Sequence, residues 1–180
     1  MSTRSLIAMQ LEDDKYKTIY CHFDGYLSHN GALLLDYYNT PEIINELLEL
    51  GNISCLAKNL YPDPTMIHGF DYNERQEDVV VAYGRERGEK NTEAIILSYK
   101  ELTDEYGDAD YIYVFTQDNK WMYLKPYEHS ELQSVEEDLK TLYLEKGLTR
   151  PNDYYGCLDD DIVEELKNIC QIDESEMEVQ

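Results

Sequence analysis

The side chains best suited to joint chemistry lie in one short stretch near the start of the sequence. His22, Asp24 and His29 fall within residues 20–38, which the residue pattern predicts to fold as a strand, a glycine turn and an apolar helix. Two imidazoles and a carboxylate can bind zinc or a related metal when further ligands come from elsewhere in the chain. The candidates for those further ligands are His68, Asp71 and His129.

The spacing of these residues matches no established zinc motif, and a strand-end histidine bonded to a turn aspartate explains the same pattern. We therefore expect no metal and no cofactor. His22, Asp24 and His29 remain candidates for lining a small-ligand pocket.

A second candidate for ligand binding is the charged segment 84–90, which holds two glycines and three basic residues. Arg85 and Arg87 could attract an anion such as a nucleotide phosphate, because the chain offers few other basic residues. They could complete a pocket with the turn at 20–29 and the long segment 61–78. A hairpin or strand-to-helix loop with alternating charges is the favoured explanation of the segment, and the anion site stays open as the alternative.

The sequence lacks the motifs of the common enzyme classes. It contains no G-x-S-x-G turn, no phosphate-binding P-loop and no G-x-G-x-x-G motif. Cys21 adjoins His22, but neighbours on a strand point to opposite faces, so the two cannot pair as nucleophile and base. We expect the protein not to be an enzyme.

The net charge of the chain is its most unusual property. Asp and Glu number 38 against 15 Lys and Arg, which gives a formal charge of -23. Such a surface repels nucleic acid and anionic membranes and attracts basic surfaces, so we expect no direct nucleic-acid binding and no membrane binding. The charge could serve solubility, or it could imitate the phosphates of DNA.

Two predicted helices carry most of the candidate acidic surface. Acidic residues at a helix N-terminus also complement the helix dipole, which gives the run 159–161 a purely structural explanation. The candidate partner-binding residues are Glu131, Glu136, Glu137, Asp138, Asp159, Asp160, Asp161, Glu164 and Glu165.

The order of predicted elements indicates an α+β fold, with an antiparallel or mixed sheet of about four or five strands and helices mainly on one face. The predicted strands are 5–11, 16–23, 79–83, 111–116 and 121–124, of which the first two and the last two form hairpins. The predicted helices are 30–38 with Asn30 as N-cap, 41–50 after Thr40, 130–146 after Ser130, and an acidic C-terminal helix from Asp159. Residues 53–59 are expected to form a short helical turn, and 92–106 fit strand or helix.

We expect one domain over residues 1–172 and a frayed acidic tail over 173–180. No apolar run is long enough for a membrane span, and no signal peptide is expected at the N-terminus. The cysteines at 21, 55, 157 and 170 form no C-x-x-C pair, so we expect reduced thiols in a cytosolic protein.

Residues 3–7 (TRSLI) and 20–26 (YCHFDGY, a Y-C-H-x-D-G-Y pattern) resemble a group of small acidic proteins encoded by bacteriophages and prophages. Gly31, Leu34-Leu35, Tyr37-Tyr38 and the later segment 81–85 (VAYGR) extend the resemblance. It names no activity. It implies a viral origin, expression in the cytoplasm of a bacterial host, and an accessory role such as host takeover or countering host defence.

Three functions follow from these observations. The first is an inhibitor that binds a basic surface of a host protein, such as a nucleic-acid-handling or defence protein, by presenting a DNA-like negative surface. The second is a small-ligand or nucleotide-binding protein, or an enzyme, that uses the turn at 20–29 and the loop with Arg85 and Arg87. The third is an interaction module without inhibitory role, and a homodimer stays open in each case.

Overall fold

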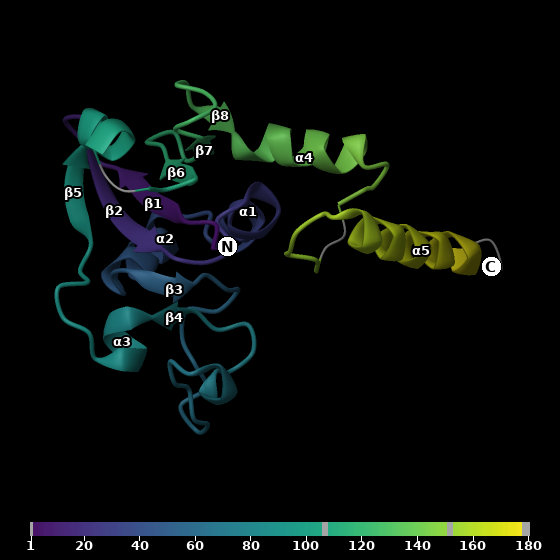
Figure 1. Cartoon of the computed structure of the whole chain (residues 1–180), viewed down its shortest axis with the longest axis horizontal. Helices are drawn as coiled ribbons and strands as arrows, with labels where there is room; N and C mark the ends of the chain where they lie inside the picture. The colour runs from purple at the N-terminus through teal and green to yellow at the C-terminus, as the bar shows by residue number, and fades with distance from the viewer. Residues whose placement is uncertain (1, 106–107, 151–152, 178–180) are drawn as a thin grey trace.

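The structure, a computed structural model, describes residues 2–105, 108–150 and 153–177, with side chains described up to Ile169. Its centre is one mixed sheet of eight strands, larger than the four or five predicted (Figure 1). The strands follow the order β4-β3-β2-β1-β6-β7-β8, and β5 pairs with the free part of β2. Their bounds are β1 Ser5–Gln10, β2 Lys15–Cys21, β3 Ile53–Cys55, β4 Val81–Ala82, β5 Ile95–Ser98, β6 Tyr111–Phe115, β7 Trp121–Leu124 and β8 Gln133–Ser134.

Both predicted hairpins are present. β1 and β2 pair antiparallel from Ser5↔Cys21 to Gln10↔Tyr16, and the backbone N–H of Leu11 donates to the Lys15 carbonyl at 2.7 Å. In the turn between these two residues, Asp13 and Asp14 both have positive φ, a conformation that Asp adopts more readily than most residues. β6 and β7 pair antiparallel in the same way. β1 joins the hairpins by pairing parallel with β6, which makes the sheet mixed.

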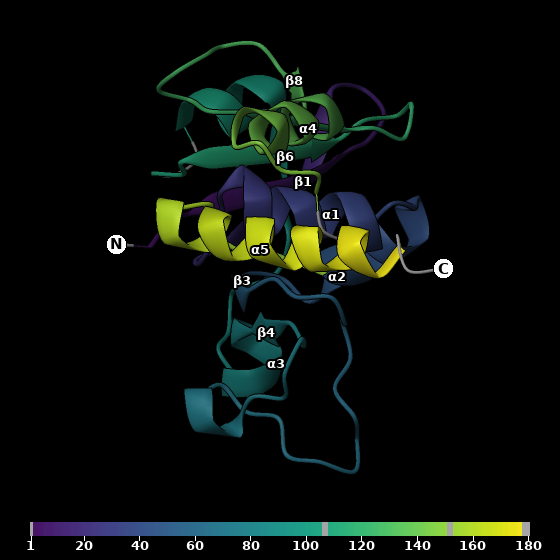
Figure 2. The ribbon, with the colours of Figure 1, turned by 90° about the vertical axis from the view of Figure 1, so that its right-hand side faces the viewer.

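Most helices cover one face of the sheet. α1, α2 and α4 lie against this face, and α5 lies beyond them, farthest from the strands (Figures 1 and 2). The helical elements are the π-helix η1 Leu27–Gly31, α1 Ala32–Tyr37, α2 Pro41–Glu49, the 3₁₀ turn η2 Tyr72–Glu74, α3 Tyr83–Arg87, the π-helical turn η3 Glu101–Glu105, α4 Val135–Glu145 and α5 Asp160–Met177.

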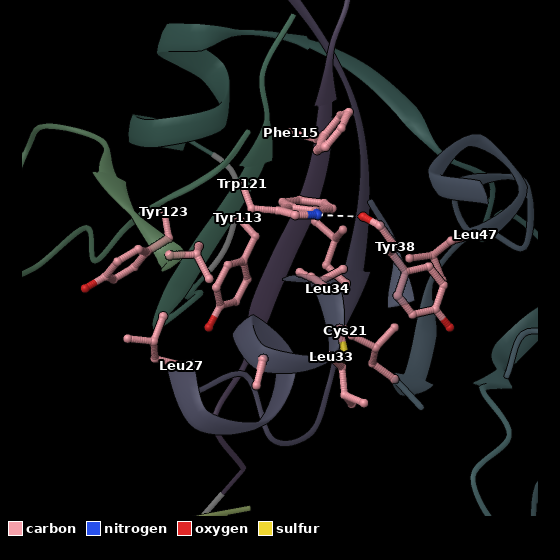
Figure 3. Close-up of a cluster of buried hydrophobic side chains, with 14 of the residues drawn as sticks. Cys21, Leu27, Leu33, Leu34, Tyr38, Leu47, Tyr113, Phe115, Trp121 and Tyr123 are labelled. Carbon is pink, nitrogen blue, oxygen red and sulfur yellow. Dashed lines mark hydrogen bonds between the residues drawn. The ribbon is translucent and has the colours of Figure 1, made fainter. Parts of the chain in front are cut away.

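The core has two parts, one on each face of the sheet. On the helical face, Trp121 is buried and its indole N–H donates to the Tyr38 carbonyl at 2.6 Å, which ties β7 to the end of α1 (Figure 3). On the other face, a smaller cluster that includes Leu6 and Ile112 is covered by Leu102 of η3. The sheet is therefore buried on both faces at its centre.

Several predicted elements are wrong in type. Residues 53–59 begin with strand β3 instead of a helical turn, because Ile53 pairs with both Cys21 and Ala82. Only Val81–Ala82 of the predicted strand 79–83 belongs to the sheet, and the charged segment that follows forms α3 instead of a loop. Residues 92–106 contain both alternatives, as β5 and then η3.

Two helix starts also differ from the predictions. Asn30 is not an N-cap but lies inside η1. Phe23, the last residue of the predicted strand 16–23, lies beyond the end of β2 and is 39% exposed. α4 begins at Val135, with Ser134 as its N-cap, whose side chain accepts from the backbone N–H of Glu137. The N-cap therefore lies four residues later than the predicted Ser130, because residues 133–134 pair with β7 as β8.

The helix after Thr40 is confirmed. The Thr40 side chain accepts from the backbone N–H of Ile43, Pro41 is the first helical residue, and Gly51 follows the helix with φ +74°. α5 runs to Met177, into the segment predicted to be a frayed tail, and residues 178–180 lie outside the described residues.

Candidate functional site

The turn after β2 is held by a buried asparagine. Asn30 is fully buried, and its amide nitrogen donates to Ser5 Oγ at 3.1 Å, Cys21 Sγ at 3.3 Å and the Phe23 carbonyl at 3.4 Å. Its side-chain oxygen faces His29 Nδ1 at 2.9 Å. These bonds fasten η1 to the first two strands, so the Asn30 side chain has a structural role.

Gly25 is required at the same turn. A Cβ at this position would lie 2.9 Å from both Ser5 Cβ and the Thr3 carbonyl oxygen, closer than real Cβ atoms approach. The Gly25 carbonyl also accepts from the buried Tyr113 hydroxyl at 2.7 Å. The sequence pattern Asp24-Gly25 is therefore explained by close backbone packing, with Asp24 at φ 56°.

The three turn residues of the predicted ligand pocket point to different surroundings. His22 Nδ1 bonds to the Tyr20 hydroxyl at 2.7 Å, and its ring contacts Phe23 edge-on. Burial raises the pKa of the Tyr26 phenol, and the neighbouring charge of Asp24 raises it further. His29 lines a cavity of about 270 Å³ whose other walls include Lys58 and Tyr155, and none of the other four predicted pocket residues lines it.

Arg85 is used to hold the chain together. Its guanidinium donates to the carbonyls of Leu60 at 2.6 Å and Val80 at 2.8 Å, and it forms an ion pair with Glu86. The Glu86 carboxylate also accepts from the backbone N–H of Ala82 at 2.5 Å, and its side chain is only 2% exposed. The Arg85 guanidinium, paired with the buried Glu86 carboxylate, therefore fastens α3 to both ends of the segment 60–80.

His68 extends this buried cluster. Its side chain is 3% exposed, Nδ1 accepts from the backbone N–H of Gln76 at 3.0 Å, and Nε2 donates to the Val80 carbonyl at 3.2 Å. Nε2 also lies 3.7 Å from the Glu86 carboxylate. Both ring nitrogens of His68 are thus used in contacts that hold the loop.

Arg87 is the predicted pocket residue with the most accessible charge. Its guanidinium stacks over the rings of Phe70 at 4.3 Å and Tyr83 at 4.9 Å and pairs with Glu89. The two arginines therefore have different roles: Arg85 holds the loop, and Arg87 lies on the surface. Across the described residues, no group of three or more His, Cys, Asp or Glu side chains is arranged to hold a metal ion.

The acidic residues near α4 have structural explanations. With the helix starting at Val135, Glu136, Glu137 and Asp138 all fall in its first turn, where carboxylates complement the dipole. Asp138 also accepts from the Tyr123 hydroxyl at 2.9 Å and is half-buried. Glu131 precedes β8 and does not belong to the helix.

The acidic residues of α5 are different. Asp159 caps the helix, since its Oδ1 accepts from the backbone N–H of Ile162 at 3.1 Å. The dipole explains Asp160 and Asp161 in the first turn but not the residues one turn later, because the effect falls off beyond the first turn. Four exposed carboxylates of this helix have no ion pair with a basic side chain in the described part of the chain: Asp160, Asp161, Glu164 and Glu165.

The loop 61–78 exposes four large apolar side chains. Gln76 fixes its course, because the amide donates to the carbonyls of Asp63 at 2.9 Å and Met66 at 3.2 Å, and the Asp63 backbone N–H donates back at 2.7 Å. A loop fixed in this way loses little entropy on binding, which favours contact with another protein. The exposed side chains are Tyr61 at 60%, Met66 at 62%, Ile67 at 80% and Tyr72 at 85%.

Sequence reasoning missed a cavity of about 500 Å³ between α1, α4 and residues 148–150. At its edge, Asp36 accepts from Arg150 and, at 2.7 Å, from the Tyr155 hydroxyl. The pair is about one quarter exposed on each side. Residues 114 positions apart make this contact, so no local sequence pattern could have indicated it.

No helix in the described part of the chain is apolar and long enough to cross a membrane. Comparisons of the chain with protein-family models, with curated proteins and with solved structures found no match.

Proposed function

We propose that the protein binds a basic surface of another protein and occupies it in place of nucleic acid. The observation that carries this proposal is the acidic surface of α5 and of the segment that precedes it. Residues 153–177 hold nine carboxylates and one lysine, and the exposed carboxylates at 160–165 lack basic partners among the described residues. A carboxylate that is neither buried nor paired is free to meet a cation on a partner.

The position of α5 suits this role. The helix lies on the outside of the helical layer, where a partner can reach it (Figure 2). Carboxylates three and four residues apart on one helix face lie about 5–6 Å from each other. Duplex DNA carries one charge per roughly 1.7 Å of its axis, so α5 would imitate a short run of phosphates only together with acidic residues outside this helix.

The loop 61–78 supports a protein as the partner. Its fixed, exposed apolar side chains offer contact area that a small cation or a peptide of lysines alone does not require. With the resemblance of residues 3–7 and 20–26 to phage proteins, we propose that the partner is a nucleic-acid-handling or defence protein in the cytoplasm of a bacterial host, and that binding inhibits it.

The test compares two variants with the same net charge. One neutralises α5 (Asp161→Asn, Glu164→Gln, Glu165→Gln), and the matched control neutralises three exposed carboxylates elsewhere (Glu12→Gln, Glu42→Gln, Glu93→Gln). A partner is captured from bacterial lysate with the unmodified protein, identified by mass spectrometry and purified. Its affinity for each variant is then measured at rising salt and in competition with duplex DNA.

We expect the α5 variant to bind at least tenfold more weakly than the control, DNA to compete with the unmodified protein, and rising salt to weaken binding. Equal affinity of both variants would show that the charge acts only in general attraction or not at all, and would refute the role of α5. A partner that binds DNA and this protein at the same time would refute the proposal that the protein takes the place of nucleic acid.

A further inference from the structure

The cavity between α1, α4 and residues 148–150 has the size and composition of a small-molecule site. Its volume of about 500 Å³ lies within the range of about 300–1,000 Å³ that is usual for ligand pockets. Its apolar wall is formed by Leu35, Leu139, Leu144 and Leu148 together with Tyr143. Its polar lining consists of Asp36, Glu136, Lys140, Thr149 and Arg150.

Two buried polar atoms at this cavity have no hydrogen-bond partner among the described residues: the hydroxyl of Tyr143 and Nε of Arg150. Tyr143 is only 1% exposed. Burying a polar group without a partner is unfavourable, so native structures keep few of them, and each calls for an explanation. Two such atoms beside one cavity point to a ligand that would supply the partner.

The chemistry of the two atoms defines that partner. Arginine Nε can only donate, and the tyrosine hydroxyl has a proton to donate, so the complementary group is an acceptor. The other nitrogen that Arg150 uses, Nη2, already donates to Asp36, whose charge is further compensated by the Tyr155 hydroxyl. Glu136 and Lys140 offset each other in charge at the rim, so the cavity is a nearly neutral place on a strongly acidic protein.

We propose that this cavity binds a small carboxylic acid with an apolar body. The carboxylate accepts from Arg150 Nε and the Tyr143 hydroxyl, because hydrogen bonds with an ionised acceptor are stronger than those between neutral groups. The hydrocarbon part packs on Leu35, Leu139 and Leu144. Both polar atoms are covered by neighbouring side chains, so binding includes a small rotation of the Arg150 side chain, a common adjustment on binding. The proposal does not depend on the acidic surface of α5.

The experiment titrates the full-length protein with butanoate, hexanoate and octanoate and follows backbone amide signals by NMR. We expect shifts confined to residues 35–36, 136–144 and 148–150, with affinity rising about fourfold for each added methylene until the cavity is full. Octylamine, which carries a donor in place of the acceptor, should not shift these signals. Octanol should bind at least tenfold more weakly than octanoate.

Two variants separate binding from folding. Tyr143→Phe removes a hydroxyl that bonds to no described residue, so we expect octanoate affinity to fall about tenfold while the thermal midpoint stays equal or rises. Leu144→Glu places a negative charge on the wall at a side chain that is 62% exposed, so it should abolish octanoate binding without unfolding the protein. Arg87→Gln, which removes one positive charge on α3, is the control and should leave octanoate affinity unchanged.

The proposal is overturned if octanoate shifts no signals around the cavity, if octylamine binds there as well as octanoate, or if both cavity variants retain the affinity of the unmodified protein. A Tyr143→Phe protein that loses stability would also count against it, because the hydroxyl would then have a structural partner.

Discussion

Glu86→Gln tests how the segment 59–86 is held in place. The Glu86 carboxylate is 2% exposed and accepts from two donors, the backbone N–H of Ala82 at 2.5 Å and Nε of Arg85. Glutamine keeps one acceptor oxygen and puts an NH₂ group where the second oxygen was. One of the two donors must therefore lose its partner, and the charge that balances Arg85 is removed.

The size of the effect follows from the burial of the two partners. Leaving a buried donor unpaired costs about 1–3 kcal/mol, and removing one member of a fully buried ion pair costs about 3–5 kcal/mol. The Arg85 side chain is 25% exposed and keeps its bonds to two carbonyls, so water and those carbonyls compensate part of its charge. We therefore expect a loss of about 2–3 kcal/mol, less than for a fully buried ion pair and near the upper end of the range for one unpaired donor.

Native-state hydrogen exchange is the suitable assay, because the loss concerns local opening of the loop. The amide of Val80 bonds to the Asn59 carbonyl at 2.9 Å, and the amide of Gln76 bonds to His68 Nδ1 at 3.0 Å. Since 1.4 kcal/mol corresponds to a factor of ten, both amides should exchange about 30- to 140-fold faster in Glu86→Gln under conditions where exchange reports the opening equilibrium.

The control is Glu89→Gln, two positions beyond the end of α3. Glu89 also pairs with an arginine, but its side chain is 44% exposed, so its removal should change stability by less than about 0.5 kcal/mol. Equal exchange rates at Val80 and Gln76 in the two variants would refute the claim that the buried ion pair holds the loop.

Three further predictions concern single groups. With a thiol reagent at pH 8, the exposed Cys157 should react first and Cys21 only on unfolding, since burial raises the Cys21 pKa to about 12; early labelling of Cys21 would contradict this. Trp121→Phe should lower the free energy of unfolding in urea by about 2 kcal/mol, because the Tyr38 carbonyl loses a buried donor, and an unchanged midpoint would contradict the bond. Burial, and then the charge of Asp14, raises the Tyr16 pKa to about 12. The contribution of this phenol to the free energy of unfolding is therefore complete below pH 10 and is lost as the pH rises toward 12. The shift would be refuted by a free energy of unfolding that does not fall in this range, or by an ultraviolet titration in which all tyrosines of the folded protein titrate normally.

The elements that sequence reasoning predicted correctly are those whose signals are local. Thr40 and Pro41 start α2 and Gly51 ends it, and all three act on neighbouring backbone groups. The two hairpins follow from alternating apolar residues on either side of a short polar turn. Each of these features needs no information from distant parts of the chain.

The elements it missed depend on distant partners. Asn30 has the residue type of an N-cap, but its side chain bonds to Ser5, 25 residues away, which a local pattern cannot show. Strand β3, where a helical turn was predicted, exists because Ile53 pairs with both Cys21 and Ala82. Tertiary contacts decided these assignments, as they commonly do for short elements.

The charged residues were the hardest to interpret from sequence, because composition does not separate buried from free carboxylates. Glu86 stands in a run that alternates in sign and reads as a solvated loop, yet it is nearly inaccessible. The position of Glu86 between two arginines, just after a buried apolar run, was one weak signal that these charged side chains pair with one another. Asp36 gave no signal, because its partner Arg150 comes from the far end of the chain.

The acidic residues therefore fall into groups with different meanings. Glu86 and Asp36 pair with arginines inside the fold, and Asp138 bonds to a buried tyrosine, so these three carboxylates stabilise the fold itself. Glu164 and Glu165 have neither an ion-pair partner among the described residues nor the helix dipole to explain them. They also lie one turn from Asp160 and Asp161, where like charges on one helix face repel and slightly destabilise the helix. Solubility alone is served as well by spaced charges, whereas a cationic partner would relieve this repulsion on binding. The arrangement of charge on α5, rather than the total of -23, is thus the reason to look for a basic partner.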